Sequence, residues 1–580
     1  MKKFLCVLCV LCGCLSARAL DRQAFTITSY SLQAHLDPTT GGFAVEGSLQ
    51  LRNDSATPQR NVDLQISSTL EWKGITANGK DVQWLWQPYT SDIDHSGALS
   101  EAIVTLPAAV PPKGSVDLLV TYAGTIPADT TRLQRLGVPA AVAARSDWDR
   151  VSPEFTAVRG LGYVVWYPVA LDAANLSQGS EVFDAIAAWK QRHAASNLDV
   201  IFWSEAAGTI EANSYRQVVN TQGMQKERPL GGYKWQGLGR AVPTFAFGDY
   251  RERVEPGITV DYLPGKESAA ADYVRVAQST EDIAVSWFGR PRQRPVLVDL
   301  VGPRDSLILV DLPDTSAEPY ESGTWLFAPL KTTDSQSLEL TFAHQWTHAA
   351  LDSPRPWIYE GAAHFIQALE RERQGGRQAA LDYMAAHLPA LRAAEAPPPA
   401  ASPAAPAGQS LITATDAALY RTKGMYVFWM LRELVGDDAL QKAFLNYRAA
   451  DDKEPSYFQR LLEAQTPKKL EWFFDDWVYR DRGLPDLRIA AVYPRPTLRG
   501  SYTLTVTVEN LGGAAAEVPV ILRGEGGEVV KRVQVAGHSQ EVLHMQLPAK
   551  PIEVVVNDGS VPESDMKNNS MPVTLPKNPQ

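Results

Sequence analysis

The stretch T-F-A-H-Q-W-T-H-A-A-L-D-S-P-R-P-W-I-Y-E-G-A-A-H-F-I-Q, residues 341–367, decides how the rest of the chain is interpreted. His344 and His348 are four residues apart, so on a helix both imidazoles lie on one face, one turn apart. Eleven residues separate His348 from Glu360, which opens a second apolar helix that the Gly-Gly pair at 375–376 closes. Two imidazoles so placed bind one zinc ion from the same side, and the Glu360 carboxylate offers a third ligand. The pattern predicts a site for one Zn²⁺ ion with its fourth position left for water.

This pattern resembles the H-E-x-x-H plus W-x-x-E-G signature of the gluzincin zinc metallopeptidases, and within them the alanyl-aminopeptidase family, which includes leukotriene hydrolase. In that family the Glu after the first His takes a proton from the attacking water and passes it to the leaving amine. This chain has Gln345 there, and an amide of nearly the same shape does not accept a proton at ordinary pH. Loss of a positioned acid–base group typically costs about 100- to 10,000-fold in rate. The sequence therefore predicts a metal site without its general base.

One further departure from the family pattern and one alternative interpretation must be considered. The family has eighteen residues between the second His and the Glu, so the eleven found here remove a loop at the site. A lone H-x-x-x-H among nine histidines also fits two packed histidines with no metal. Three further motifs, described next, favour the metal site.

Composition limits the number of domains, the class of protein and the partners that this chain can have. A chain of 580 residues predicts several domains, and 45% hydrophobic with 21% charged residues is ordinary for a soluble globular protein. The net charge of −11, with no basic cluster, argues against nucleic acid as a partner. After the first 19 residues no run of 18 or more apolar residues follows, so no transmembrane span is predicted.

The first 19 residues predict a signal peptide for export to the periplasm or beyond. Lys2 and Lys3 precede an apolar run, and Ala17-Arg18-Ala19 is an A-x-A cleavage site. The cysteines of the chain are Cys6, Cys9, Cys12 and Cys14. Cleavage would leave a mature chain without disulfides or thiol chemistry. The alternative is a lipoprotein signal with Cys14 lipidated; cleavage and release is the favoured interpretation.

Residues 20–250 predict an N-terminal β domain. F-T-I-T-S-Y-S-L-Q-A-H-L-D (25–37) alternates, with Tyr30, Leu32, Ala34 and Leu36 on one face. A generic β-sandwich would give the same alternation. The order of a G-x-L-x-L-x-N strand, a P-P-x-G turn and a final P-T-F-A-F-G-D-Y strand (243–250) resembles the saddle domain of the aminopeptidase family.

Residues 251–483 predict a helix-rich, thermolysin-like catalytic-type domain with a small sheet. A strand at 258–263 precedes a helix at 268–288, and two short apolar strands follow at 295–301 and 306–313. Tyr320-Glu321-Ser322 lies where the family has its G-x-M-E-N segment, and the resemblance implies that Glu321 holds the α-ammonium of a substrate. The alternative is a surface glutamate in a loop.

The segment L-Y-R-T-K-G (419–424) resembles the family's Y-x-K-G helix, whose Tyr donates a hydrogen bond to the oxyanion. Tyr420 stands three residues before Lys423 instead of two, and one residue on a helix is about 100° of rotation. Tyr426 is predicted to be core. His364, one turn after Glu360, is a substitute ligand, a partner of a ligand or a packed surface histidine, and the last is favoured. Residues 396–408 predict an exposed, polyproline-like loop.

Residues 484–580 predict an immunoglobulin-like β-sandwich without a ligand. The stretch 501–522 is interpreted as a hairpin-like pair of strands with period two, and 554–569 resembles the last turn of small bacterial adhesion modules. The fold class is thus multidomain α+β.

Three functional hypotheses follow from Gln345 and the retained ligands. The first is a slow but active zinc aminopeptidase that uses another base. The second, which the sequence favours, is a zinc-binding relative that holds peptide or protein N-termini with weak or lost hydrolysis. The third is a surface scaffold that keeps only the fold.

Overall fold

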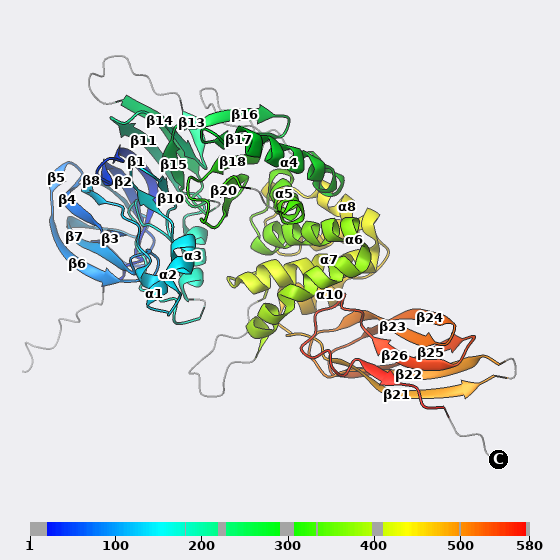
Figure 1. Ribbon diagram of the computed structural model, residues 1–580. Helices are drawn as coiled ribbons and strands as arrows, with labels where there is room; N and C mark the ends of the chain where they lie inside the picture. Colours follow the sequence, from blue (N-terminus) through cyan, green and yellow to red (C-terminus); the bar gives the residue numbers. More distant parts are fainter. Residues whose placement is uncertain are drawn as a thin grey trace, which may run out of the picture.

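The computed structural model describes residues 20–179, 181–217, 228–239, 241–290, 307–331, 334–396, 410–497 and 500–575. A β-rich N-terminal part is followed by a helical part with a small sheet and then by a C-terminal β-sandwich (Figure 1). The predicted multidomain α+β class is confirmed. The signal peptide at 1–19, the strand at 295–301 and residues 397–408 of the predicted loop lie outside the described residues. No helix in the described part of the chain is both long and apolar enough to cross a membrane.

The N-terminal part is built on one long, twisted sheet. Tyr30, Leu32, Ala34 and Leu36 of the first strand are at most 3% exposed, as the alternation predicts. The sheet order is β13 (Tyr215–Gln217), β14 (Arg228–Gln236), β11 (Asn197–Ser204), β1 (Phe25–Asp37), β2 (Gly42–Asn53), β8 (Ser115–Thr125), β4 (Leu70–Ala77) and β5 (Lys80–Asp81). β1 pairs with β2 in antiparallel and with β11 in parallel register.

Two smaller sheets and three helices complete this part. One sheet runs β3 (Gln59–Ser67), β7 (Ala98–Val110), β6 (Gln83–Thr90), and the other β12 (Thr209–Ala212), β15 (Phe245–Gly248), β10 (Thr156–Val158), β9 (Arg150–Val151). The helices are α1 (Thr131–Gln134), α2 (Ala140–Ser146) and α3 (Glu181–Arg192). Sequence patterns did not predict α3, which is the element of this part that matters at the site below.

In the described residues, the helical part starts with a five-stranded sheet. Its order is β16 (Arg251–Glu255), β17 (Ile258–Tyr262), β18 (Leu307–Asp311), β20 (Trp325–Ala328) and β19 (Tyr320–Ser322). The helices are α4 (Glu267–Phe288), α5 (Ser335–Ala350), α6 (Pro356–Glu395), α7 (Gly424–Val435), α8 (Asp437–Asn446), α9 (Tyr457–Glu463) and α10 (Glu471–Phe474). Short helical segments are η1 (Ala418–Lys423), η2 (Ala449–Asp451) and η3 (Asp475–Tyr479). The predicted strand at 258–263 and helix at 268–288 match β17 and α4 within one residue at each end.

The two helices that carry the predicted ligands have clear start and break signals. Asp334 caps α5, because its side chain accepts the Ser337 backbone N–H at 3.1 Å. α6 begins at Pro356, where the missing N–H costs no hydrogen bond. Its helical course is interrupted at Gly376, with φ 77° and ψ 178°, so the Gly-Gly pair breaks the helix where the sequence predicts.

Packing fixes how these helices face one another. Trp346 of α5 is 1% exposed and donates its indole N–H to the Ala277 carbonyl of α4 at 2.7 Å. α6 and α7 cross at two glycines, since a Cβ on Gly361 would lie 2.8 Å from the Gly424 Cα. Any larger residue at this crossing would push the helices apart. The register of α6 against α7 therefore sets the direction of Glu360, which precedes Gly361.

The C-terminal part is a two-layer sandwich, as predicted. One layer is β21 (Leu487–Pro496), β22 (Tyr502–Asn510), β25 (Ser539–Leu547) and the other β24 (Gly527–Val535), β23 (Ala516–Gly524), β26 (Pro551–Val556), β27 (Ser570–Pro572). The predicted hairpin over 501–522 is wrong, because β22 and β23 lie in different sheets. Alternation shows which face of a strand is buried, and both strands bury one face in the core they share, so the pattern does not identify the neighbouring strand.

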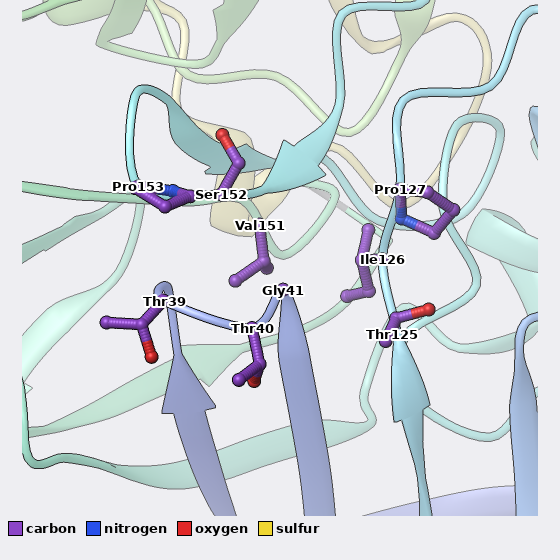
Figure 2. Close-up of a pocket in the computed structure, with 9 residues that line it drawn as sticks. All are labelled: Thr39, Thr40, Gly41, Thr125, Ile126, Pro127, Val151, Ser152 and Pro153. Atoms are coloured by element: carbon purple, nitrogen blue, oxygen red, sulfur yellow. The ribbon is translucent and has the colours of Figure 1, made fainter.

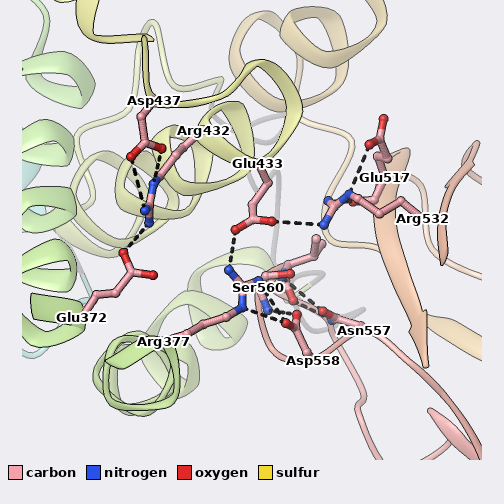
Figure 3. Close-up of polar contacts among 11 residues, drawn as sticks. Glu372, Arg377, Arg432, Glu433, Asp437, Glu517, Arg532, Asn557, Asp558 and Ser560 are labelled. Carbon is pink, nitrogen blue, oxygen red and sulfur yellow. Dashed lines mark hydrogen bonds and ion pairs between the residues drawn. The ribbon is translucent and has the colours of Figure 1, made fainter. Parts of the chain in front are cut away.

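Charged side chains tie the sandwich to the helices (Figure 3). Arg377 of α6 pairs with Glu433 of α7 at 2.5 Å and with Asp558, after β26, at 2.9 Å. Arg532 of β24 pairs with Glu433 at 3.1 Å. A shared carboxylate between two guanidinium groups joins three elements, so the network fixes orientation more firmly than separate surface pairs.

A buried ion pair within the helical part yields a stability prediction. Lys423 and Glu395 pair at 2.6 Å, with side chains 1% and 4% exposed. Removing one partner leaves a buried charge without a counterion, so we expect Lys423→Ala to lower the free energy of unfolding by about 3–5 kcal/mol. Urea unfolding followed by far-UV circular dichroism measures it, with the exposed Lys469→Ala as the matched control. Equal stability of the two variants would contradict the assignment.

Candidate metal centre

Two histidines of α5 form the centre of the site. His344 and His348 lie one turn apart and are 5% and 3% exposed. Their Nε2 atoms are 2.9 Å apart and point at the same space. The ring of Tyr359 stacks on the His348 ring with centroids 4.0 Å apart, which fixes the plane of that imidazole. The i, i+4 spacing thus brings both nitrogens together.

Glu360 of α6 faces the same nitrogens. Its Oε2 is 4.0 Å from His344 Nε2 and its Oε1 is 3.9 Å from His348 Nε2. Arg421 of η1 donates from Nε to Glu360 Oε2 at 3.1 Å. The half-buried Glu360 carboxylate therefore points inward, and the Arg421 guanidinium holds the oxygen that faces His344.

Glu321 of β19 joins the same group of atoms. Its Oε1 is 2.9 Å from His344 Nε2 and 3.7 Å from His348 Nε2. Its Oε2 accepts a hydrogen bond from Gln345 Nε2 at 2.6 Å. Candidate ligand atoms of Glu321, His344, His348 and Glu360 all lie within 4.8 Å of one another. The residue that the sequence marks as an amine anchor thus lies inside the candidate metal site.

The donor set fits a zinc ion. A tetrahedral ion with bonds of about 2.0–2.2 Å places neighbouring ligand atoms roughly 3.3 Å apart. The separations between the two imidazole nitrogens and between imidazoles and carboxylates, 2.9 to 4.0 Å, bracket that value, and all four ligand atoms lie within 4.8 Å of one another. Imidazole and carboxylate are ordinary zinc ligands. Within the described residues, Gln345 Oε1 and His348 Nδ1 are buried without a hydrogen-bond partner, so the site has spare polar capacity beside the four atoms.

The electrostatics of the cluster depend on its opposite charges. Burial alone would raise the pKa of Glu321, but the charge of His344 and hydrogen bonds from both histidines hold it well below its usual range. Burial alone would lower the pKa of His344, yet the Glu321 carboxylate raises it. A proton between these groups occupies the space a cation would take, so metal binding displaces that proton.

His364 and Tyr420 lie beside the cluster. The His364 ring packs edge-on against the His344 ring at 5.1 Å and is half-buried, outside the group of four ligand residues. Tyr420 lies in η1, a π-helical segment. A π turn contains one residue more than an α turn, so the direction of Tyr420 relative to Lys423 differs from that in an α-helix. Burial raises the pKa of Tyr420, and the charges of Glu360 and Glu321 act on it in the same direction.

Two cationic residues at the site, Arg421 and Lys190, belong to no motif from which sequence analysis could predict their place there. Arg421 lies between Tyr420 and Lys423 and meets Glu360 only because η1 crosses α6. Lys190 comes from α3 of the N-terminal part. Burial lowers the pKa of Lys190, while Glu360 raises it and Arg421 lowers it. By contrast, Tyr426 is 1% exposed and belongs to the core, as predicted.

A separate cavity of about 320 Å³ lies in the N-terminal part (Figure 2). Its lining comes from residues 39–41, 125–127 and 151–153. No charged side chain is among them, and they share no residue with the metal cluster. This cavity has no role in the site.

Comparisons with known proteins give a distant likeness. The sequence matches no family model and no curated protein. Among solved structures, the chain is similar to the M1 zinc metallopeptidase from Deinococcus radiodurans, with 17% identity and a TM-score of 0.46 over 80% of this chain and 95% of that one. For a mutant of that enzyme bound to a Tyr-Ser-Ala substrate, the identity is 16% and the TM-score 0.47, over 81% of this chain and 97% of that one. Similarity at this level does not establish the chemistry of this chain, which depends on its own side chains.

The geometry predicts one tight metal site. Removing an imidazole leaves an incomplete ligand set, so we expect His348→Ala to weaken zinc binding by more than the roughly 10- to 100-fold typical of losing an outer-shell partner. Competition with a chromophoric chelator measures the affinity. His544→Ala, an exposed histidine of the C-terminal sandwich, is the matched control and should bind as the natural chain does.

Proposed function

We propose that this chain is an exported zinc-binding relative of the metallopeptidases that holds peptide or protein N-termini and hydrolyses them weakly or not at all. One observation carries the proposal. Two imidazoles and two carboxylates from three separate elements converge on one space, while Gln345 occupies the position of the missing base. Convergence of this kind supports a retained metal, and the amide supports reduced catalysis.

Some of the residues at this site would bind the metal ion, and others orient those ligands or a bound peptide. A zinc ion bound with an open coordination position would supply a Lewis acid that polarises a carbonyl group. His344, His348 and Glu360 would hold it, and Arg421 orients Glu360. The Glu321 carboxylate offers an anionic acceptor for an ammonium group, and the resemblance assigns to Tyr420 the role of hydrogen-bond donor to an oxyanion. Gln345 donates an N–H to Glu321 at 2.6 Å, so it acts as a hydrogen-bond donor and not as a proton acceptor.

An active zinc aminopeptidase is the second candidate, and one contact favours it. Glu321 touches both His344 and Gln345, so a carboxylate does lie where a substitute base would be needed. Both of its oxygens are already engaged, Oε1 by His344 and Oε2 by Gln345, so neither is free to accept a proton from water. We therefore rank this candidate below the binding function.

Restoring the base tests the proposal. We expect purified protein to contain zinc and to show little turnover on a panel of aminoacyl fluorogenic substrates. Gln345→Glu should raise kcat/KM by about 100- to 10,000-fold, because it returns a positioned acid–base group. Gln345→Asn, which stays an amide, is the matched control and should give no gain.

Other outcomes separate the candidates. Ready turnover by the natural sequence, abolished by a chelator, would establish an active aminopeptidase and overturn the loss of hydrolysis. Absence of bound zinc under all loading conditions would leave only a scaffold. A peptide with a free N-terminus should bind more tightly than its N-acetylated form, and equal binding would remove the amine-recognition role.

A further inference from the structure

Glu321 approaches the imidazoles more closely than Glu360 does. A single oxygen, Oε1, lies 2.9 Å from His344 Nε2 and 3.7 Å from His348 Nε2. The corresponding distances from Glu360 are 4.0 and 3.9 Å and involve two different oxygens. We propose that Glu321 is a fourth protein ligand which closes the metal site, and that Gln345 positions it. The inference rests on the metal binding of the proposed function and deepens it.

The backbone beneath Glu321 is anchored on both sides. Glu321 lies on edge strand β19, opposite Leu326 of β20. The preceding Tyr320 ring packs edge-on against Tyr163 of the N-terminal part at 5.4 Å. The following Ser322 is buried, and its hydroxyl accepts a hydrogen bond from Asn213 Nδ2 at 2.8 Å. Contacts with β20 and with the N-terminal part thus hold the strand in place. The backbone of Glu321 is therefore fixed, and its side chain extends from there to α5.

Gln345 is suited to hold this carboxylate. Its amide donates to Glu321 Oε2 at 2.6 Å and leaves Oε1 directed at the two imidazoles. A carboxylate at position 345 would have no proton to donate, and two ionised carboxylates at this distance repel each other. Ligating carboxylates are commonly held by outer hydrogen-bond partners, and losing such a partner costs about 10- to 100-fold in metal affinity. The amide therefore plays the part of such a partner.

Coordination number agrees with a closed site. Two imidazoles and two carboxylates supply four protein ligands, which complete a tetrahedron. Structural zinc sites are closed in this way, whereas catalytic sites keep a position open. A substrate ammonium would then have to draw Glu321 off the ion, so the ion and the peptide N-terminus compete for one carboxylate.

Zinc affinity gives the first test. Competition with a chelator is measured for the natural chain, Glu321→Gln and Gln345→Leu, with the exposed Glu318→Gln from the same segment as the matched control. We expect the Kd to rise at least about 100-fold for Glu321→Gln and about 10- to 100-fold for Gln345→Leu. It should stay within about twofold for Glu318→Gln. An unchanged Kd for Glu321→Gln would overturn the inference.

Cobalt substitution gives a readout that affinity alone does not. The Co²⁺-loaded natural chain should keep its visible spectrum when azide is added, because no position is open. The Co²⁺-loaded Glu321→Ala chain should change its spectrum as azide enters; Glu321→Gln replaces it if circular dichroism shows that the alanine variant is unfolded. If azide shifts the spectrum of the natural chain as it shifts that of the variant, the ion has three protein ligands and an open position. That result would overturn the inference about Glu321 but would not contradict the proposed function. No metal bound by the natural chain would sink both.

Discussion

The meeting of His344 and His348 with two carboxylates is the interaction on which the rest of the site depends. Four polar side chains share a space where their ligand atoms lie within 4.8 Å of one another. Such a group is costly to bury unless its charges are balanced. The hydrogen bond between Glu321 and His344 offsets part of this cost, and a divalent cation in the same space would compensate the charge of the carboxylates. The cluster is therefore poised to exchange a proton for a metal ion.

The fold brings these groups together from three elements that are themselves fixed. α5 is held by its Asp334 cap and by the Trp346 indole bond to α4. α6 is set by its close crossing with α7 at Gly361 and Gly424. β19 is clamped between the small sheet and the N-terminal part. The N-terminal β part is thus part of the site's architecture, because without it the strand carrying Glu321 would be an edge hairpin with one free side.

Local periodicity explains which features could be predicted from sequence. His344 and His348 share a helix face through their spacing alone, and Glu360 follows from the next helix. The strands of the N-terminal part follow from alternation, as do the two-layer C-terminal sandwich and the core position of Tyr426. The hairpin over 501–522 failed because alternation does not identify a strand's neighbour.

Contacts that depend on how elements cross could not be predicted. The reach of Glu321 into the metal cluster depends on the placement of β19 against α5. Arg421 meets Glu360 because η1 crosses α6, and the π turn that carries Tyr420 has no signal in single letters. Lys190 comes from α3, a helix that no motif predicted. These contacts arise from the packing of elements against one another, and the spacing of residues along the sequence does not indicate them.

The amide at position 345 has two consequences that follow from the same change. It removes the group that would accept a proton, and it adds a donor aimed at Glu321. A Glu at this position would set a second carboxylate against Glu321, and the two would have to share a proton or separate. With Gln345, Glu321 stays ionised and keeps one oxygen on the imidazoles. Under the proposed function, a site without its base needs no open position for water, and Gln345 holds the proposed closing carboxylate through its hydrogen bond to Glu321. The proposed loss of hydrolysis and the proposed closure of the metal site would then both follow from the one residue at position 345.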